Sequence, residues 1–299
     1  MQPQTLRTLR DIAARDLAPG VTDLGLGEAV LLRRNAPSAL EGTLYRPLLC
    51  LVLQGAKEVT SGTLSVRNPA GSAIIVSHEL PVMSRITEAS DVEPYIAFVL
   101  PIDLGLLRSF YDTTPDLSGD DDSGALLSTP ADPALLDAVA RFLAIARDDT
   151  ARALLGPIAL REIHARLLLS AEGSILRRFL RRGDPSNHVA RAISSIRASL
   201  DAPLSVTRLA EEAGMSRSSF HVHFKAVTGL TPGQYQKDIR LIEARRRILE
   251  GRAAISTVAY DLGYESAAHF SRDYARKFGQ SPRADRKVEH EVARLVGAT

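Results

Sequence analysis

The chain has 299 residues, 45% of them hydrophobic and 24% charged, an ordinary globular profile whose length suits two domains better than one. The net charge is only +2, and the single cysteine, Cys50, excludes an intrachain disulfide and a cysteine zinc cluster. The longest apolar stretch, around Leu48 to Leu53, is too short to cross a bilayer, and the first thirty residues lack a secretory hydrophobic region. We therefore expect a cytoplasmic protein without membrane contact.

The charge is unevenly distributed along the chain. Residues 187–299 contain 18 Lys and Arg against 12 Asp and Glu, whereas residues 1–186 contain 19 against 23. A basic C-terminal part fits contact with nucleic acid at one end of the molecule, although a charged face is more often simply solvated.

The first hundred residues alternate short β-type runs with turn residues, after an amphipathic helix predicted from Thr5 to Leu17. The predicted strands are Ala29–Arg33, Leu48–Gln54, Lys57–Thr60, Leu64–Arg67, Ala73–Val76, Met83–Thr87 and Tyr95–Leu100. Strands of this length and spacing predict a small sandwich or barrel.

Helices are predicted from Ile102 to Tyr111, Pro133 to Ala146 and Leu154 to Leu169, with an exposed loop over 113–128. The last helix has an apolar face of Leu160, Ile163, Leu167 and Leu168, which suits either the chain's own β domain or a second subunit. The charged segment 177–185 is predicted as a linker. Ser186 is the expected cap of a helix over His188–Leu200, and Pro232 is the expected start of a long helix to Glu250.

The last third of the chain contains one unit twice. The copies read AEEAGMSRSSFHVHFKAVTGLTP at 210–232 and AYDLGYESAAHFSRDYARKFGQSP at 259–282. Both place Ala four residues before Gly, two aromatics four residues apart, and a Gly before Ser/Thr-Pro. A repeat at about 50 residues indicates one structural unit used twice.

Each unit is predicted to be a helix-turn-helix. Gly214 permits the positive φ of the turn, Ser216 caps the second helix, and Phe220 and Phe224 share its inner face. The second helix of such a motif enters the DNA major groove. Small donors, histidine and basic residues at its exposed positions are the groups that contact bases and phosphates.

With these two units, the C-terminal third resembles the DNA-binding domain of AraC/XylS-type transcription regulators. The second unit carries most of the resemblance, at Ala259, Gly263-Tyr264, Ser266, Phe270, Arg272, Tyr274, Lys277-Phe278, Gly279 and Ser281-Pro282. The resemblance implies that bases are read by Ser218, His221, Val222, Ala267, Ala268, Ser271 and Arg272.

Arg272 is the best candidate for reading a guanine, since Ala267 and Ala268 cannot donate; a salt bridge with Asp273 or Asp261 is its alternative role. The residues assigned to phosphates, which are otherwise simply solvated, are Arg217, Lys225, Ser266, Arg276 and Lys277.

The front half resembles the cupin-like N-terminal domain of one AraC-type subfamily, at Leu48 to Val59, Gly71, Leu80-Pro81 and Pro94-Tyr95, with Ala56 as a departure. This implies an α+β protein: a cupin-like effector-binding domain (1–101), a helical dimerisation region (102–176), a linker (177–186) and a DNA-binding domain (187–299). The expected partners are promoter DNA, a small effector of unknown identity, RNA polymerase and a second copy of the chain.

Other functions are weaker hypotheses. His221 and His223 lie two residues apart on a predicted helix and cannot share a metal, and the front half offers only His78 and perhaps His164, so no cofactor is predicted. Ser77, Ser84 and Cys50 lack a surrounding catalytic motif, which argues against an enzyme. A ligand-independent DNA-binding adaptor remains open. Cys50 is either an electrophile sensor or an inert buried thiol. We predict an effector-responsive activator.

Overall fold

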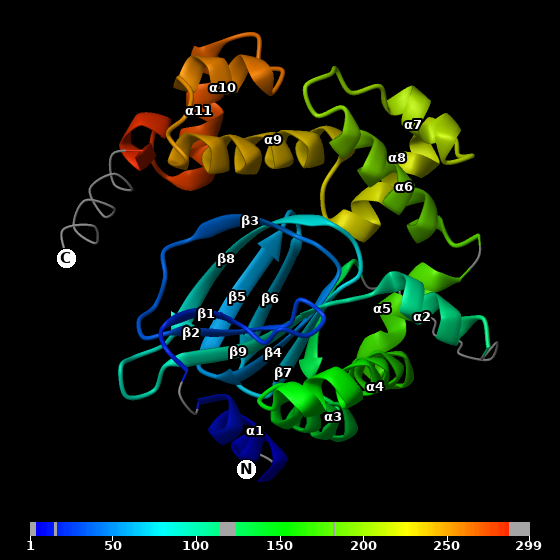
Figure 1. Ribbon diagram of the computed structural model, residues 1–299. Helices are drawn as coiled ribbons and strands as arrows, with labels where there is room; N and C mark the ends of the chain where they lie inside the picture. Colours follow the sequence, from blue (N-terminus) through cyan, green and yellow to red (C-terminus); the bar gives the residue numbers. More distant parts are fainter. Residues whose placement is uncertain (1–3, 15–16, 114–123, 182, 287–299) are drawn as a thin grey trace.

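The computed structural model describes residues 4–14, 17–113, 124–181 and 183–286. Within these residues, two antiparallel sheets form the β domain (Figure 1), with strand orders β1-β2-β9-β4-β7-β10 and β3-β8-β5-β6. No ladder joins the two sheets in this part of the chain, so the domain is cupin-like but not a closed barrel. The strands are β1 (Gly20–Asp23), β2 (Val30–Arg34), β3 (Glu41–Tyr45), β4 (Leu48–Gln54), β5 (Ala56–Ser61), β6 (Leu64–Pro69), β7 (Ser72–Val76), β8 (Leu80–Glu88), β9 (Tyr95–Pro101) and β10 (Leu126–Pro130).

Three strands differ from the expectation. β1 and β3 were not predicted, because both are short and mostly polar. The predicted loop over 113–128 is wrong at its end, where β10 begins at Leu126 and pairs with β7 in register Leu126↔Val76. Two apolar residues beside a polar run are too weak a pattern to show this edge strand, while residues 114–123 lie outside the described part of the chain.

Helices make up the rest of the regular secondary structure in the described chain, and none of them combines the length and apolarity needed to span a membrane. They are α1 (Gln4–Ala14), α2 (Leu104–Tyr111), α3 (Pro133–Ile145), α4 (Asp149–Leu169), η1 (Ala171–Gly173), α5 (Ser174–Leu180), α6 (Pro185–Ala198), α7 (Val206–Glu212), α8 (Arg217–Thr228), α9 (Pro232–Leu249), α10 (Ile255–Asp261) and α11 (Ala267–Phe278).

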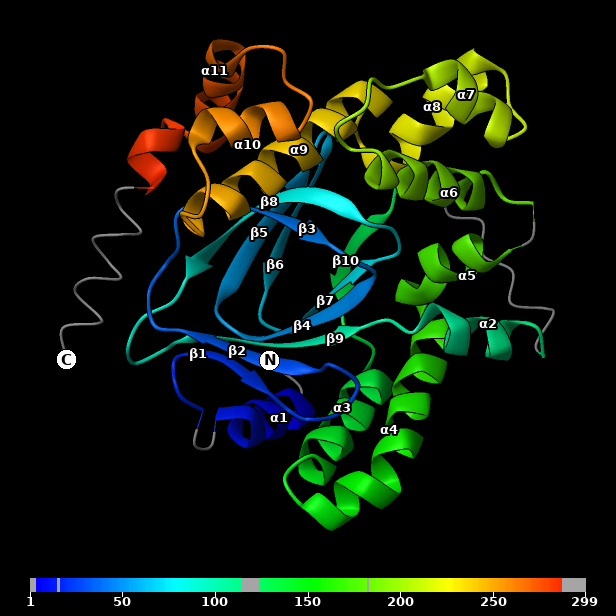
Figure 2. The same ribbon diagram turned by 45° about the horizontal axis from the view of Figure 1, so that its top comes forward.

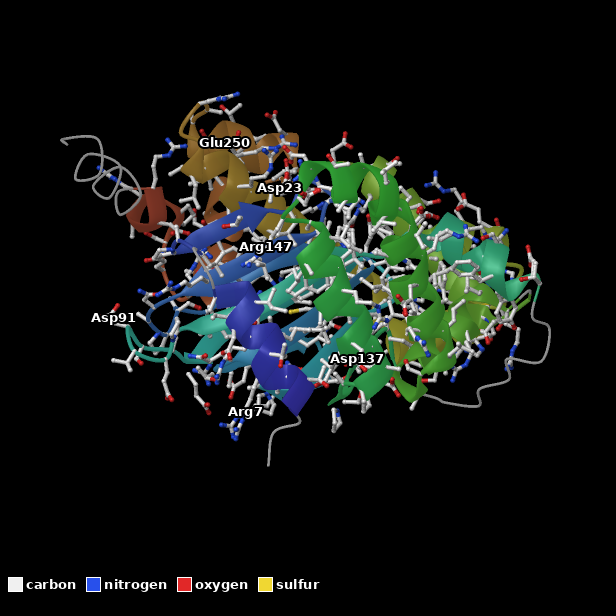
Figure 3. The ribbon with its side chains drawn as sticks, turned by 60° about the horizontal axis from the view of Figure 1, so that its bottom comes forward. Arg7, Asp23, Asp91, Asp137, Arg147 and Glu250 are labelled. Carbon is white, nitrogen blue, oxygen red and sulfur yellow. The ribbon has the colours of Figure 1, made fainter. Side chains whose placement is uncertain are left out.

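The central strands β4, β7 and β9 of the six-stranded sheet are buried on both faces, which explains the continuous apolar run of β4. Leu49, Leu51 and Leu53 face a core shared with α1, α3 and α4, while Cys50 and Val52 face the space between the sheets. Figure 3 shows α1 and α3 lying over the sheet, where Arg147 at the end of α3 donates to the Ile12 carbonyl of α1.

The region expected to be a separate helical segment therefore shares its core with the β domain. The α4 residues Ile163, Leu167 and Leu168 are buried in that core, with Leu160 packed at its edge, so this face serves the chain's own fold. The opposite face of α4 exposes other apolar side chains: Leu154, Leu155 and Ile158, with Leu169 further along.

The predicted linker is mostly helical. α5 covers residues 174–180, because Ile175, Leu176, Phe179 and Leu180 are apolar at helical spacing and buried, a pattern hidden by the four arginines around them. α6 begins at Pro185, and its N-cap is Asp184, whose carboxylate accepts from the Ser186 amide at 2.9 Å. The expectation that Ser186 caps this helix was wrong.

The C-terminal helices lie over the four-stranded sheet. α9 passes along β3 and β8, with α6, α7 and α8 near its start and α10 and α11 near its end (Figures 1 and 2). Side chains of α6, α8 and α9 join Val59, Val76 and Val82 of the β domain in one core. The α+β fold predicted from the sequence is confirmed, and the first helix-turn-helix unit is packed against the β domain.

Candidate nucleic-acid interface

The two repeated units have the same local geometry. Ser216 accepts a hydrogen bond from the Ser219 amide at 3.2 Å at the start of α8, and Ser266 accepts one from the His269 amide at 3.4 Å at the start of α11. Gly229 (φ 74, ψ −1) and Gly279 (φ 75, ψ −2) end the two helices in the left-handed conformation. α8 and α11 are therefore equivalent second helices of two helix-turn-helix units.

The inner faces of α8 and α11 are core, as predicted. Phe220, Phe224, Phe270 and Tyr274 are each 0% exposed. Phe224 meets Tyr235 of α9 edge to face, with ring centroids 5.3 Å apart. Because these rings occupy the inner positions, the positions on the opposite side of each helix are turned outward.

The outer face of α8 carries the predicted contact residues. Arg217, Ser218 and Lys225 are exposed, and Val222 is 67% exposed although it is apolar. His221 is half-buried beside them. An exposed apolar side chain on such a helix has the chemistry that contact with a thymine methyl requires.

The outer face of α11 presents Arg272 and Ala268 to solvent. Arg272 makes no hydrogen bond or ion pair within the described residues, so the alternative of a salt bridge with Asp273 or Asp261 is not found there. Ser271 is half-buried and donates to the Ala267 carbonyl at 2.8 Å, which engages its hydroxyl within the helix.

The residues assigned to phosphate contacts differ in their exposure and in their ion pairs. Arg276 is 67% exposed, although it pairs with Asp273 one turn earlier. The Lys277 side chain is only 11% exposed, and its Nζ lies 2.8 Å from Asp238 of α9. That ion pair gives Lys277 a structural role that the sequence motif did not indicate.

Two ion pairs between α9 and α11 were not foreseen. The Lys237 ammonium lies 2.8 Å from Asp273, and Asp238 receives Lys277, so adjacent residues of α9 hold both ends of one helical stretch of α11. Burial alone would raise the pKa of the Asp273 carboxyl, yet Lys237, with Arg276 and His269, brings that pKa below its ordinary value. The only sign of these ion pairs in the sequence was the adjacent Lys237 and Asp238.

Arg240 of α9 also escaped the sequence reasoning. Its guanidinium donates to the carbonyls of Leu200 at 2.6 Å, Ala202 at 2.9 Å and Gly263 at 3.3 Å. Gly263 is the turn of the second unit, and Leu200 and Ala202 lie in the connection that leads to the first. One arginine therefore ties both units to α9.

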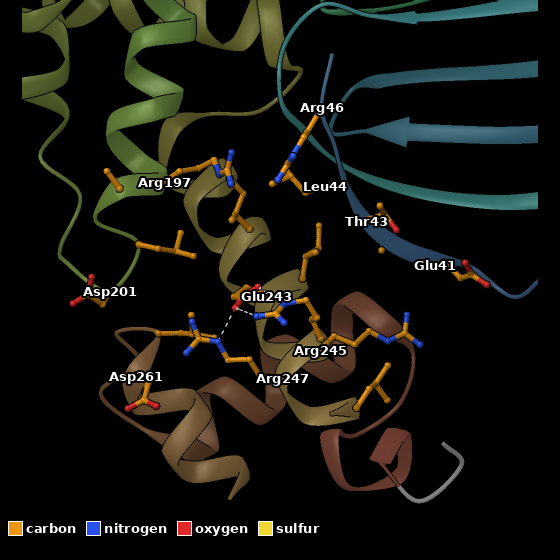
Figure 4. Close-up of a pocket in the computed structure, with 18 residues that line it drawn as sticks. Glu41, Thr43, Leu44, Arg46, Arg197, Asp201, Glu243, Arg245, Arg247 and Asp261 are labelled. Carbon is orange, nitrogen blue, oxygen red and sulfur yellow. Dashed lines mark hydrogen bonds and ion pairs between the residues drawn. The ribbon is translucent and has the colours of Figure 1, made fainter. Parts of the chain in front are cut away.

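A cleft of about 960 Å³ separates β3 from α6, α9 and α10 (Figure 4). Its apolar lining includes Leu44, Ile239 and Ile242. At its base Glu243 pairs with Arg246 and Arg247, which lowers the pKa of the Glu243 carboxyl. Arg46 is exposed at the cleft and has no hydrogen-bond or ion-pair partner among the described residues.

Other chemistry finds little support. His221 and His223 both lie on α8, and no group of three or more His, Cys, Asp or Glu side chains in the described residues is arranged to hold a metal ion. Cys50 is buried, and burial raises the pKa of its thiol, which favours the inert thiol over the electrophile sensor.

Comparisons with known proteins agree with both halves. Residues 27–175 match the family model of the AraC-type transcriptional regulator N-terminus, and residues 209–287 match that of a helix-turn-helix domain. The chain is 35% identical over 76 residues to the transcriptional activator RhaS of Pectobacterium atrosepticum, 25% of this chain and 27% of RhaS. It is 29% identical over 106 residues to the transcriptional regulator ArgR of Pseudomonas aeruginosa, 36% of this chain and 32% of ArgR.

These curated relatives are thus matched over about a quarter to a third of their length. In fold, the structure is similar to ToxT from Vibrio cholerae, with a TM-score of 0.56 and 12% identity, covering 88% of this chain and 97% of ToxT. An unsaturated fatty acid-bound ToxT structure is similar with a TM-score of 0.55 and 12% identity, covering 84% of this chain and 93% of that one. Since two family models cover most of the β domain and of both helix-turn-helix units, the chain belongs to the AraC-type transcriptional regulators.

Proposed function

We propose that this protein is an effector-responsive transcription activator that grips duplex DNA with α8 and α11 in successive major-groove turns. The observation that carries the proposal is the pair of helices with the same capping residues, whose outer faces are exposed within the described residues. The relatives RhaS and ArgR, named as a transcriptional activator and regulator, support the same assignment.

Within this proposal Arg272 donates to a guanine edge, because it is an exposed guanidinium with no hydrogen-bond or ion-pair partner among the residues that the structure describes. Val222 and Ala268 contact thymine methyl groups, and Ser218 and His221 complete the reading of the first half-site. Ala267 and Ser271 are half-buried and contribute less. The proposed phosphate contacts are Arg217, Lys225, Arg276 and the amides that follow Ser266; Lys277 is left out because Asp238 engages it.

We assign the effector to the cleft between β3 and α9. Its volume is of the size that holds a small molecule, and a ligand there touches both the β domain and the DNA-binding helices. Binding that differs between two arrangements of these parts would shift DNA affinity. Arg46 lines the cleft together with the apolar Leu44 and Ile242, a combination that suits an apolar carboxylic acid, the class to which the fatty acid of the ToxT complex belongs.

We also propose a homodimer through α4, and the support for it is the outer face of this helix. Leu154 is 69%, Leu155 47% and Ile158 63% exposed, an apolar group with no partner in the described residues. Such patches on soluble proteins mark interaction sites. Pairing across a two-fold axis would set the spacing of two half-sites on DNA. Contact with RNA polymerase remains a prediction from family membership.

Selection of bound fragments from a random duplex pool by the full chain tests DNA reading. Recovery of one enriched motif supports it; no preference over scrambled competitor in moderate salt overturns it. Repeating the selection with oleate, and with the Arg46→Ala variant, separates a sensor from a ligand-independent adaptor. An adaptor binds the motif equally under all these conditions.

A further inference from the structure

The C-terminal end of α8 packs against the β domain. The last carbonyls of a helix have no partner within the helix and need one from elsewhere. Here the Ala125 amide donates to the Val227 carbonyl at 2.7 Å, and the Thr63 amide donates to the Gly229 carbonyl at 3.1 Å. The Ser61 hydroxyl donates to the Thr228 carbonyl at 3.3 Å. Three successive carbonyls of the first recognition helix are therefore satisfied by the β domain.

In this contact the backbone around Gly62 lies directly against the backbone around Gly229. A Cβ atom on Gly62 would lie 2.2 Å from the Gly229 carbonyl oxygen, and one on Gly229 would lie 2.4 Å from the Ser61 carbonyl oxygen. Neither position has room for a methyl group without separating the two segments. We call this contact the joint: residues 61–63 and 124–125 on one side, 227–229 on the other.

Contacts around the joint involve the same parts of the chain. The Tyr235 hydroxyl of α9 donates to the Glu79 carbonyl at 2.7 Å, and Arg197 of α6 pairs with the Glu79 carboxylate. His78 contacts the Ser186 carbonyl of α6 at 3.0 Å through Nε2. On the side of the DNA-binding helices, these groups lie on α6, which packs against α8, and on the first half of α9.

The second unit is held differently. Within the described residues no hydrogen bond or ion pair joins 251–286 to the β domain; Lys237 and Asp238 of α9 hold α11 instead. Gly279 ends α11 in the same conformation as Gly229 ends α8, yet a Cβ there would meet nothing within 4 Å. The two caps are equivalent in backbone conformation and differ in what lies against them.

We propose that the β domain holds the first recognition helix by its C-terminus, and that this joint couples the β domain to DNA contact at α8 more strongly than at α11, where the Phe278 ring packs on Gly42 of β3. The DNA-facing side chains Arg217, Ser218 and Val222 are exposed while the joint is closed, so the joint orients α8 rather than covering it. Because the coupling free energy between two sites is reciprocal, DNA bound to α8 changes the stability of the joint by the same amount as closure of the joint changes the free energy of DNA binding. This second part rests on the proposed DNA binding.

Hydrogen exchange of the full chain measures the joint directly, at the amides of Thr63 and Ala125. The test variant is Gly229→Ala, and Gly279→Ala is its matched control, since both substitutions carry the same left-handed strain and only the first meets the β domain. Without DNA, we expect both amides to exchange at least about fivefold faster in Gly229→Ala than in Gly279→Ala, the lower end of ordinary coupling. Equal exchange in the two variants overturns the joint.

The same measurement with a duplex chosen by selection tests the coupling. In the wild-type chain and in Gly279→Ala, bound duplex changes exchange at Thr63 and Ala125; in Gly229→Ala this change is lost although duplex still binds. Duplex that binds the wild-type chain and leaves both amides unchanged overturns the coupling. If no duplex binds, the proposed function fails, while the comparison without DNA still decides the joint. Should Gly229→Ala not fold, Ser61→Ala removes one donor at the same place with little strain.

Discussion

The Lys237 ammonium lies 2.8 Å from the carboxylate of Asp273, whose side chain is 2% exposed, and this pair fixes the second recognition helix to α9. A carboxylate so buried needs a cation, because an unpaired buried charge is strongly disfavoured. Arg276 and His269 also approach it from the solvent side. The face of α11 that carries Arg272 is oriented by this contact.

We expect Asp273→Ala to lower the free energy of unfolding by about 2–3 kcal/mol, because it leaves Lys237 half-buried without its partner. The control is Arg276→Ala, which removes a 67% exposed partner of the same carboxylate and should cost less than about 1 kcal/mol. Urea unfolding at neutral pH measures both. Equal losses would mean that the Lys237–Asp273 pair does not anchor α11.

Arg272→Ala should weaken binding to the preferred duplex by about 1–3 kcal/mol and relax the preference at one base pair. Lys225→Ala, at an exposed position of α8, should instead weaken binding to all duplexes alike and reduce the salt dependence. Fluorescence anisotropy against a panel of single-base variants, at two salt concentrations, separates these patterns. A uniform loss for Arg272→Ala would make that residue a phosphate contact.

Stability should fall as the pH is lowered from about 6.5 to about 4, because burial lowers the pKa of His78 to about 4. In that pH range the His78 imidazole binds a proton in the unfolded chain but not in the folded one. The free energy of unfolding therefore falls by up to about 3 kcal/mol. Nearby Arg178 also lowers this pKa, whereas the Ser186 carbonyl and Asp184 raise it.

Urea unfolding at pH 7 and pH 5 checks this expectation. His78→Gln should remove most of the difference, and His188→Gln, nearby on α6, should keep it. Part of the pH dependence will remain in His78→Gln, since burial lowers the pKa of His164 as well. A His78→Gln variant with the full wild-type difference would assign the pH dependence to other groups.

Ile158→Glu should shift the chain from dimer to monomer, because it places a charge in the centre of the apolar face of α4, where Ile158 is 63% exposed. Sedimentation velocity measures the assembly state. The control is Val92→Glu, at a 90% exposed apolar residue outside this face, which should leave the dimer intact. A wild-type chain that sediments as a monomer at all concentrations would overturn the proposed interface.

The sequence by itself determined the repeated units, since caps, turn glycines and aromatic spacing are local patterns that the backbone must obey wherever the unit lies. It also indicated the strands of the β domain with strong apolar runs. Tertiary structure alone decided which apolar face of α4 is buried, that α5 includes the first residues of the expected linker, and that Lys277 is held by Asp238. Only the tertiary structure decided the joint at Gly229 as well. Its partners lie more than a hundred residues away in the chain, so no local sequence pattern indicates them.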